Sequence, residues 1–305
     1  AGVNGGACAL YSQLEDVKLS HNEFIDNTAG SSGGGVFIFI AMSEVKIQDS
    51  IFSGNIAYSG SASTVMNEEN VAMGGGALFI DVGNSFIQVF NCVMTNNSAP
   101  YSSGGACFIN SNNRHVSLTN VNQTGNSAYR GGGSLYIGSA NSNILVQNSV
   151  MSNNSAQLIG GGACLVLAYN RVTFYNTTIS ANQANVGGGA LFLVNNLSVR
   201  FVGCLIEKNY AILRGGGVNF GILHIAVKIQ STSFIDNWAP GGGAVSIEEQ
   251  SVVVIESSDF IGNGAYRLNS ADSTSADVSE AFGGAVYATS NDIDISLSSF
   301  VGNVA

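Results

Sequence analysis

The stretch FIDNWAPGGGAV, residues 234–245, places a phenylalanine three residues before an asparagine and then adds three glycines. The same combination returns along the whole chain of 305 residues. Ten asparagines each follow a glycine-rich turn by 18 to 20 residues, which indicates a repeat of about 28 residues and therefore a solenoid. These asparagines are Asn27, Asn55, Asn97, Asn126, Asn154, Asn182, Asn209, Asn237, Asn263 and Asn303.

Short apolar runs separate the glycines from the asparagines. Val36-Phe37-Ile38-Phe39 follows one turn, and alternating segments such as Val45-Lys46-Ile47 come next. Such runs predict short strands, and no stretch has the 3.6-residue period of a helix. We therefore expect an all-β fold, a right-handed parallel β-helix solenoid of about ten coils. An ordinary β-sandwich with coincidental glycines is the alternative.

Two residue types are expected to form the corners of each coil. Glycines suit a turn that requires positive φ or has no room for a Cβ. The asparagines are expected to turn inward at another corner and to stack their amides as a ladder. The sequence thus predicts ten hydrogen-bonded amides along one edge of the solenoid.

One single repeat domain, residues 1–305, accounts for the entire chain. Two units are longer than the others, and we expect long loops at residues 56–73 and 264–282, at the same point of the repeat. The sequence starts and stops inside repeat units, so we expect both ends to be uncapped. The chain would then be a segment of a longer one or would stack on other chains.

The composition narrows the range of partners. The chain is 45% hydrophobic and 10% charged, with a net charge of −10. An acidic chain argues against nucleic acid, which requires a basic surface. The longest apolar run, residues 36–42, is far shorter than the ~20 residues of a spanning helix, so no direct membrane insertion is expected.

The two motifs together resemble a known family. Gly75-Gly76-Ala77-Leu78 and Phe52-Ser53-Gly54-Asn55 are similar to the repeats of the chlamydial polymorphic membrane proteins, and the resemblance covers essentially the whole chain. It implies a pectin-lyase-like β-helix displayed at a cell surface, with a role in adhesion. The expected location is therefore extracellular or at the cell surface.

No constellation of catalytic residues stands out. His21, His115 and His224 fall at different repeat positions, and Asp-Asp pairs are absent. We expect the ten basic residues to be scattered over the solenoid. Asp292 and Asp294 alternate on one strand face, which favours solvated surface over paired carboxylate chemistry. We expect no enzyme activity, no catalytic residues and no cofactor.

Acidic residues in the two predicted loops are the candidates for metal binding. Glu68, Glu69, Asp272, Asp277 and Glu280 could supply oxygen ligands to calcium. Such charges more often keep a loop solvated, so no metal site is predicted.

Cysteines and glycosylation motifs leave alternatives open. The five cysteines do not share a column in adjacent coils, so free and mostly buried thiols are expected, with an intermolecular bridge as the alternative.

Asn-x-Ser/Thr occurs as often as chance predicts, and glycans there depend on secretion by a eukaryote. The candidate glycosylation sites are Asn96, Asn122, Asn153, Asn176 and Asn196.

A column of large side chains follows the glycine turns. If residues one and three after the anchor point inward, residue two points outward. We expect an outward apolar stripe that packs laterally against another chain; the alternative is that a neighbouring turn covers it. The stripe comprises Ile38, Phe79, Phe108, Tyr136, Leu165, Phe192, Phe220 and Tyr287.

These features predict a non-enzymatic extracellular scaffold, a building block of a surface filament or of a cell-wall or appendage assembly. The alternative is the rod of a cell-surface adhesin, and the third hypothesis is a carbohydrate-active β-helix enzyme. The expected partners are other copies or related chains, end to end or laterally, and glycans.

Overall fold

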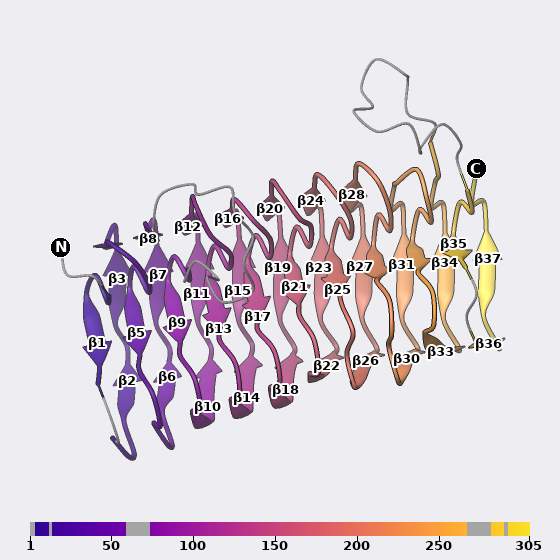
Figure 1. Ribbon diagram of the computed structural model, residues 1–305. Helices are drawn as coiled ribbons and strands as arrows, with labels where there is room; N and C mark the ends of the chain where they lie inside the picture. The colour runs from indigo at the N-terminus through magenta and orange to yellow at the C-terminus, as the bar shows by residue number, and fades with distance from the viewer. Residues whose placement is uncertain (1–3, 12–13, 59–73, 267–281, 290–291) are drawn as a thin grey trace.

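Strand pairing joins each coil to the next throughout the described part of the chain, and every strand pair is parallel. The computed structural model describes residues 4–11, 14–58, 74–266, 282–289 and 292–305 (Figure 1). Strands equivalent by repeat position lie side by side, and the two termini lie at opposite ends of the stack. The predicted all-β parallel β-solenoid is confirmed. No helix occurs in the described ranges, and so none that could span a membrane.

Three sheets of ten strands run the length of the stack. Sheet 1 contains the strands that follow the glycine turns: β1 (Cys8–Leu10), β5 (Val36–Ile38), β9 (Leu78–Ile80), β13 (Cys107–Ile109), β17 (Leu135–Ile137), β21 (Cys164–Val166), β25 (Leu191–Leu193), β29 (Val218–Phe220), β32 (Val245–Ile247) and β35 (Val286–Ala288).

Sheet 2 contains the longest strands of the repeat: β2 (Lys18–Ser20), β6 (Lys46–Gln48), β10 (Ser85–Phe90), β14 (Arg114–Thr119), β18 (Ser142–Gln147), β22 (Arg171–Tyr175), β26 (Ser198–Val202), β30 (Val227–Gln230), β33 (Val252–Glu256) and β36 (Asp292–Ser296).

Sheet 3 precedes the recurring asparagines: β3 (Glu23–Ile25), β7 (Ile51–Ser53), β11 (Val93–Thr95), β15 (Asn122–Thr124), β19 (Val150–Ser152), β23 (Thr178–Ser180), β27 (Leu205–Glu207), β31 (Ser233–Ile235), β34 (Asp259–Ile261) and β37 (Ser299–Val301). A fourth sheet follows them: β4 (Thr28–Ala29), β8 (Ile56–Ala57), β12 (Ser98–Ala99), β16 (Ser127–Ala128), β20 (Ser155–Ala156), β24 (Gln183–Ala184) and β28 (Tyr210–Ala211).

The two predicted loops are only partly within the described residues. The first was placed too early, because Ile56 and Ala57 form β8 and pair with the neighbouring coils. Gly264, at the start of the second, bridges Trp238 and Val304. Residues 59–73 and 267–281, including the candidate calcium ligands, lie outside the described residues.

The interior is filled by the inward half of each alternating strand. In β14, Val116 and Leu118 are buried, whereas the side chains between and after them face outward. Phenylalanines one coil apart stack their rings, as Phe234 and Phe260 do at 5.0 Å between centroids. Each fully buried side chain of this size contributes about 2–3 kcal/mol to the stability of the fold. Because the rings of neighbouring coils are in contact, the core is one continuous column and not ten separate clusters.

The glycine pair meets two different demands. Gly132 has φ +61°, in the left-handed region that residues with a Cβ rarely adopt. A Cβ on Gly133 would clash with the carbonyl oxygen of Gly162 in the next coil. The turn therefore requires glycine at both positions, at the first for its left-handed backbone and at the second so that the next coil can approach to the spacing of the β-ladder.

The ten recurring asparagines form a hydrogen-bonded ladder at the corner after sheet 3. The Asn97 amide nitrogen Nδ2 donates to Asn126 Oδ1 at 3.0 Å, and Asn126 Nδ2 donates to Asn154 Oδ1 at 3.0 Å. Asn126 Nδ2 also donates to the Met94 carbonyl at 2.9 Å, and Asn126 Oδ1 accepts the backbone N–H of Asn97 at 2.9 Å. Both donors and both acceptor positions of the amide are thus used. The same pattern links the members from Asn27 to Asn303.

A second polar ladder lies at the corner before sheet 2, where sequence reasoning placed none. Each side chain accepts the backbone N–H of its counterpart one coil earlier, as Asn141 Oδ1 does from Asn113 at 2.8 Å. A histidine takes the place of asparagine in one coil and a serine in the next. The members are Asn84, Asn113, Asn141, Asn170, Asn196, His224 and Ser251.

Candidate functional site

The predicted outward stripe is wrong at two of its members. Strand register pairs Phe79 with Phe37 and Phe192 with Asn219, so these residues belong to the outward column. Ile38 and Phe220 instead face the interior core. The cause is the third glycine of two triplets, residues 33–35 and 215–217. Gly35 and Gly217 pair with Ala77 and Ala244, which are the first residues after the glycine pair in their own coils. In these two coils the outward residue therefore lies one position earlier in the sequence than expected.

The rest of the stripe is outward but mostly buried. Phe79, Phe108, Tyr136 and Leu165 form a cluster separate from the interior, and none is more than 3% exposed. Leu165 packs over the glycine turn, since its Cδ2 lies 2.6 Å from where a Cβ on Gly131 would be. Phe192 and Tyr287 are half-buried. A turn of the neighbouring coil therefore covers part of this column, and its apolar surface is not free for lateral packing.

The five candidate glycosylation sites differ in accessibility. Asn96, Asn122, Asn153 and Asn176 are exposed and lie within or beside strands of sheet 3. Asn196 is 1% exposed and belongs to the second ladder, where it accepts the Asn170 N–H and donates to the Val194 carbonyl at 3.0 Å. A glycan on its amide nitrogen would require that ladder to open, so Asn196 is not a site in the folded chain.

All five cysteines are free, as predicted, and all but the half-buried Cys8 are buried. Cys107 and Cys164 belong to the interior core, and burial raises the pKa of the Cys107 thiol to about 12. Cys92 Sγ donates to the Phe90 carbonyl at 3.3 Å, as the Ser149 hydroxyl does to Gln147 in an equivalent position. These thiols therefore replace core aliphatic or hydroxyl groups and are not poised as nucleophiles.

Among the residues that the structure describes, the histidines and acidic side chains do not assemble into a catalytic or metal centre. His21 Nε2 lies 3.9 Å from Asp49, and His224 is buried in the second ladder. Asp292 and Asp294 are exposed on β36. In the part of the chain that the structure describes, no three His, Cys, Asp or Glu side chains are grouped so that they could hold a metal.

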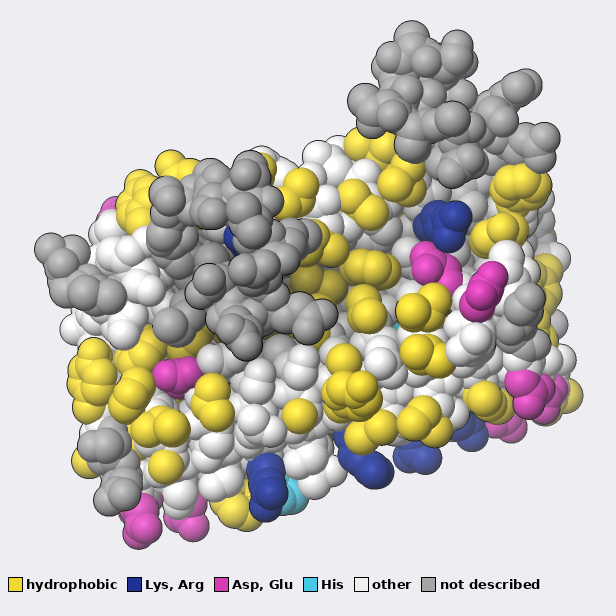
Figure 2. All heavy atoms as spheres, in the orientation of Figure 1, with side chains coloured by type: hydrophobic (Ala, Val, Ile, Leu, Met, Phe, Trp, Pro, Cys, Tyr) yellow, Lys and Arg dark blue, Asp and Glu magenta, His cyan; other side chains and the backbone are white. Residues whose placement is uncertain are grey.

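The basic residues are not scattered, which corrects the sequence interpretation. Six of the chain's ten lie on the outer face of sheet 2, between β2 and β30. The eight strands of this stretch contain no acidic residue. Figure 2 shows Lys and Arg side chains gathered along the lower edge of the view, where sheet 2 lies. We call this surface the basic face; its basic residues are Lys18, Lys46, Arg114, Arg171, Arg200 and Lys228.

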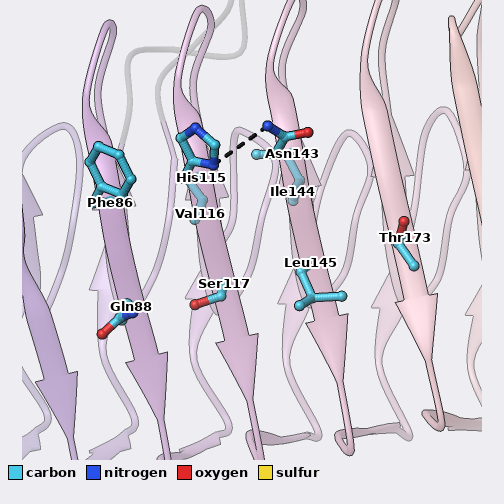
Figure 3. Close-up of a pocket in the computed structure, with 9 residues that line it drawn as sticks. All are labelled: Phe86, Gln88, His115, Val116, Ser117, Asn143, Ile144, Leu145 and Thr173. Carbon is cyan, nitrogen blue, oxygen red and sulfur yellow. Dashed lines mark hydrogen bonds between the residues drawn. The ribbon is translucent and has the colours of Figure 1, made fainter.

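A shallow hollow of about 380 Å³ lies in the basic face, over β10, β14, β18 and β22 (Figure 3). On one side, the rings of Phe86 and His115 stack at 4.7 Å with an angle of 6° between their planes. His115 Nδ1 lies 3.4 Å from the Asn143 amide nitrogen, so three successive coils form one outward row. Gln88, Ser117, Leu145 and Thr173 line the remainder.

The outward row has a left-handed backbone. Phe86, His115 and Asn143 have φ of 57°, 54° and 56°, in the left-handed region that side chains with a Cβ seldom adopt. The ladder skips these positions: Ser85 pairs with Arg114 and Ile87 with Val116. The conformation recurs in five coils, because Asp16 and Glu44 occupy the same repeat position with φ of 53° and 55°. At Phe86 it presents a half-exposed ring to solvent. Left-handed residues other than glycine also occur at other corners of the coils, such as Asn91 and Asn120, so this backbone does not by itself mark a site.

Charge divides the outer face of sheet 2 along its length. Lys228 forms an ion pair with Glu256 at 3.1 Å, and the next strand, β36, carries Asp292 and Asp294. The basic face therefore ends at β33. What it offers chemically is fixed positive charge, an aromatic ring face and amide and hydroxyl groups.

Comparison with known proteins gives only a remote structural similarity. No family model and no curated protein matches the chain. Among solved structures, the Dettilon tailspike protein (gp208) is similar, with 11% sequence identity and a TM-score of 0.33 over 92% of this chain. The match covers 60% of that tailspike chain. The likeness concerns the β-helix fold, and no functional argument rests on it.

Proposed function

We propose that this chain is a non-enzymatic rod, located outside the cell or at its surface, that attaches to its target through the basic face. One observation carries this proposal. A chain with a net charge of −10 has six of its ten basic side chains on one face, in eight strands without an acidic residue. Local charge of one sign attracts ligands of the opposite sign.

The solenoid holds this face rigid. Parallel ladders and two columns of hydrogen-bonded amides set each coil about 4.8 Å from the next. Side chains at equivalent positions, such as Arg200 and Lys228, are therefore held in register. Binding groups on strands are positioned more accurately than groups on loops, so the rod suits recognition of a long ligand.

Adhesion is favoured over filament assembly because of where the apolar side chains lie. The stripe expected to join chains laterally is largely buried, so that support for a filament is lost. The repeat resemblance to the chlamydial surface proteins also favours an adhesive rod and an extracellular location.

The chemistry of the basic face favours binding without catalysis. Glycoside hydrolysis uses a pair of carboxylates across the substrate, and strands β2 to β30 offer none. We therefore propose no enzymatic role for this face.

Lateral assembly through sheet 3 is the second candidate. Ile51, Val93 and Val150 lie in one outward column of that sheet and are 37–41% exposed. Asn122, a candidate glycosylation site, occupies the same column between Val93 and Val150. A glycan at Asn122 would block packing of another copy there, so the two properties exclude each other.

An adhesion assay with one face blocked tests the proposal. The whole chain carrying Cys8→Ala and Ser117→Cys is labelled with maleimide-polyethylene glycol, coupled to beads, and tested for retention on cell surfaces and extracellular matrix. Ser117 lies in the basic face, whereas Ser233→Cys on sheet 3 places the same polymer elsewhere. We expect blocking at Ser117 alone to abolish retention. Retention that survives it, or no retention of the unlabelled rod on any surface, refutes the proposal.

A further inference from the structure

We infer that the ligand of the basic face is an anionic polysaccharide, one bearing carboxylate or sulfate groups along its chain. This inference rests on the proposed function and adds the class of ligand. It is carried by three features of the face: unpaired positive charge, the spacing of that charge, and the hollow between the charges.

Most of the positive charge on this face has no acidic partner. Arg114, Arg171 and Arg200 are exposed, and within the described ranges no carboxylate lies within 4 Å of them. Lys228 alone is paired, with Glu256, at the edge of the face. Guanidinium groups suit carboxylate and sulfate oxygens because they donate two parallel hydrogen bonds. These exposed arginines are therefore available to bind anionic groups.

The charges are spaced along the rod axis. Lys46, Gln88, Ser117, Leu145, Thr173 and Arg200 follow one another in register across sheet 2. Lys46 and Arg200 are therefore five coils apart, about 24 Å at the coil spacing. Lys18 and Lys228 extend the row by one coil at either end. A row of this length suits an extended polymer with charges at intervals and exceeds what a single small anion could contact.

The hollow favours a sugar over another polyanion. The stacked pair Phe86 and His115 offers one flat ring surface, against which the apolar face of a sugar ring can pack. Asn143, Gln88 and Thr173 add amide and hydroxyl groups within the same hollow. Single-stranded nucleic acid is bound by a series of aromatic platforms, whereas this row continues from aromatic rings to an amide. Glu256, Asp292 and Asp294 beyond β30 mark the end of the face for any anionic ligand.

The test measures binding of the whole chain to defined polymers. Polygalacturonate supplies carboxylates, dextran sulfate supplies sulfates, uncharged dextran is the neutral control, and double-stranded DNA is the competing polyanion. Biolayer interferometry at 50 and 150 mM NaCl gives the affinity and its salt dependence. The first variant is Arg171→Gln with Arg200→Gln, and its matched control is Arg130→Gln with Lys208→Gln, which removes two charges from other faces.

We expect at least one anionic polysaccharide to bind and dextran not to bind. Because an exposed charge contributes roughly a factor of two to four, the Arg171/Arg200 variant should bind about five- to tenfold more weakly. The control variant should bind as the unmodified chain does. Phe86→Ala should weaken binding without changing the salt dependence, since the ring carries no charge.

Other results overturn the inference. Equal weakening by the control variant would mean attraction by charge without a site, and stronger binding to DNA would identify a different ligand class. If neither polysaccharide binds while bead retention still depends on the face around Ser117, the ligand class is wrong and the proposed function stands. If retention does not depend on that face, the proposed function itself fails.

Discussion

His224 makes the stability of this solenoid depend on pH. The side chain is 1% exposed and occupies a position of the second ladder where five preceding coils have asparagine. Its Nδ1 accepts the Asn196 N–H at 3.3 Å, and its Nε2 donates to the Leu193 carbonyl at 3.2 Å. Both contacts require the neutral ring with its proton on Nε2. Protonation would place a second N–H against the Asn196 N–H.

Burial lowers the pKa of His224 to about 4. The hydrogen bond to the Leu193 carbonyl raises the pKa, but by less than burial lowers it. The unfolded chain has the ordinary value of about 6.5. Since the folded pKa is the lower one, the unfolded state binds the proton first as pH falls. The free energy of unfolding is therefore unaffected by His224 above about pH 6.5 and decreases between pH 6.5 and 4. At about 1.36 kcal/mol per pKa unit, the loss is about 2 kcal/mol at pH 5 and about 3 kcal/mol below pH 4.

The matched variant is His224→Asn, which restores the residue type of the preceding coils. Urea unfolding followed by circular dichroism at pH 7 and pH 5 gives the loss in each protein, and the difference between the two losses removes the contribution of carboxylates. We expect that difference to be about 2 kcal/mol. Because solenoids need not unfold in one step, an NMR titration of the His224 Cε1–H provides the folded pKa independently.

Either of two results would refute this reasoning. If His224 titrates near pH 6.5 in the folded chain, the ring is solvated and the ladder contact does not hold it neutral. If the unmodified chain and His224→Asn lose the same free energy between pH 7 and pH 5, the pH dependence arises elsewhere.

Four further outcomes follow from individual contacts. Asn126→Ala removes an amide whose two donors and two acceptor positions are used, and should lower the free energy of unfolding by about 3–5 kcal/mol in urea titrations. Gln123 Oε1 accepts the Ser134 hydroxyl at 2.8 Å inside the core, so Gln123→Met and Ser134→Ala should each destabilise more alone than together, with a coupling of about 1–2 kcal/mol in a double-mutant cycle. Secretion from a eukaryotic host should give at most four N-glycans by mass spectrometry; a glycan on Asn196 would contradict its burial. Cys107, with its pKa raised to about 12, should resist maleimide at pH 8 until urea is added, and rapid labelling of the native chain would contradict the packing.

The repeat and its corners could be predicted because the interior imposes the same demand on every coil. A Cβ at Gly133 would meet backbone, and an amide missing at Asn126 would leave four partners unsatisfied. Such positions tolerate few residue types and recur visibly in a single sequence. The class of fold and the ladder of recurring asparagines could therefore be predicted from the sequence.

The register of the strand that follows a glycine triplet could not be predicted. A third glycine can precede the tight pair, as Gly131 does, or follow it, as Gly35 does, and both read alike in sequence. The second ladder was missed although Asn84, Asn113 and Asn141 each precede a recurring asparagine by 13 residues. Its later members change to histidine and serine, because the position requires only a side-chain acceptor for one N–H.

The basic face was missed for a related reason. Lys18, Lys46, Arg200 and Lys228 all lie nine residues before a recurring asparagine, a signal that an inspection of the outward columns would have found. Outward positions are free to vary from coil to coil, because solvent accepts any polar side chain. Variation there does not disturb the fold, and a solenoid can therefore change what it binds one coil at a time.

This separation between interior and surface indicates where function should be sought in the chain. Gln123 and Ser134, two of the interior departures from the repeat, satisfy each other and are explained by packing. Phe86, His115 and Asn143 share their left-handed backbone with the preceding coils, and their side chains point to solvent. The backbone at this position is common to five coils, and only its side chain changes, from Asp16 and Glu44 to Phe86, His115 and Asn143. Packing of the interior does not select these solvent-facing side chains, and this is why we place the proposed recognition there.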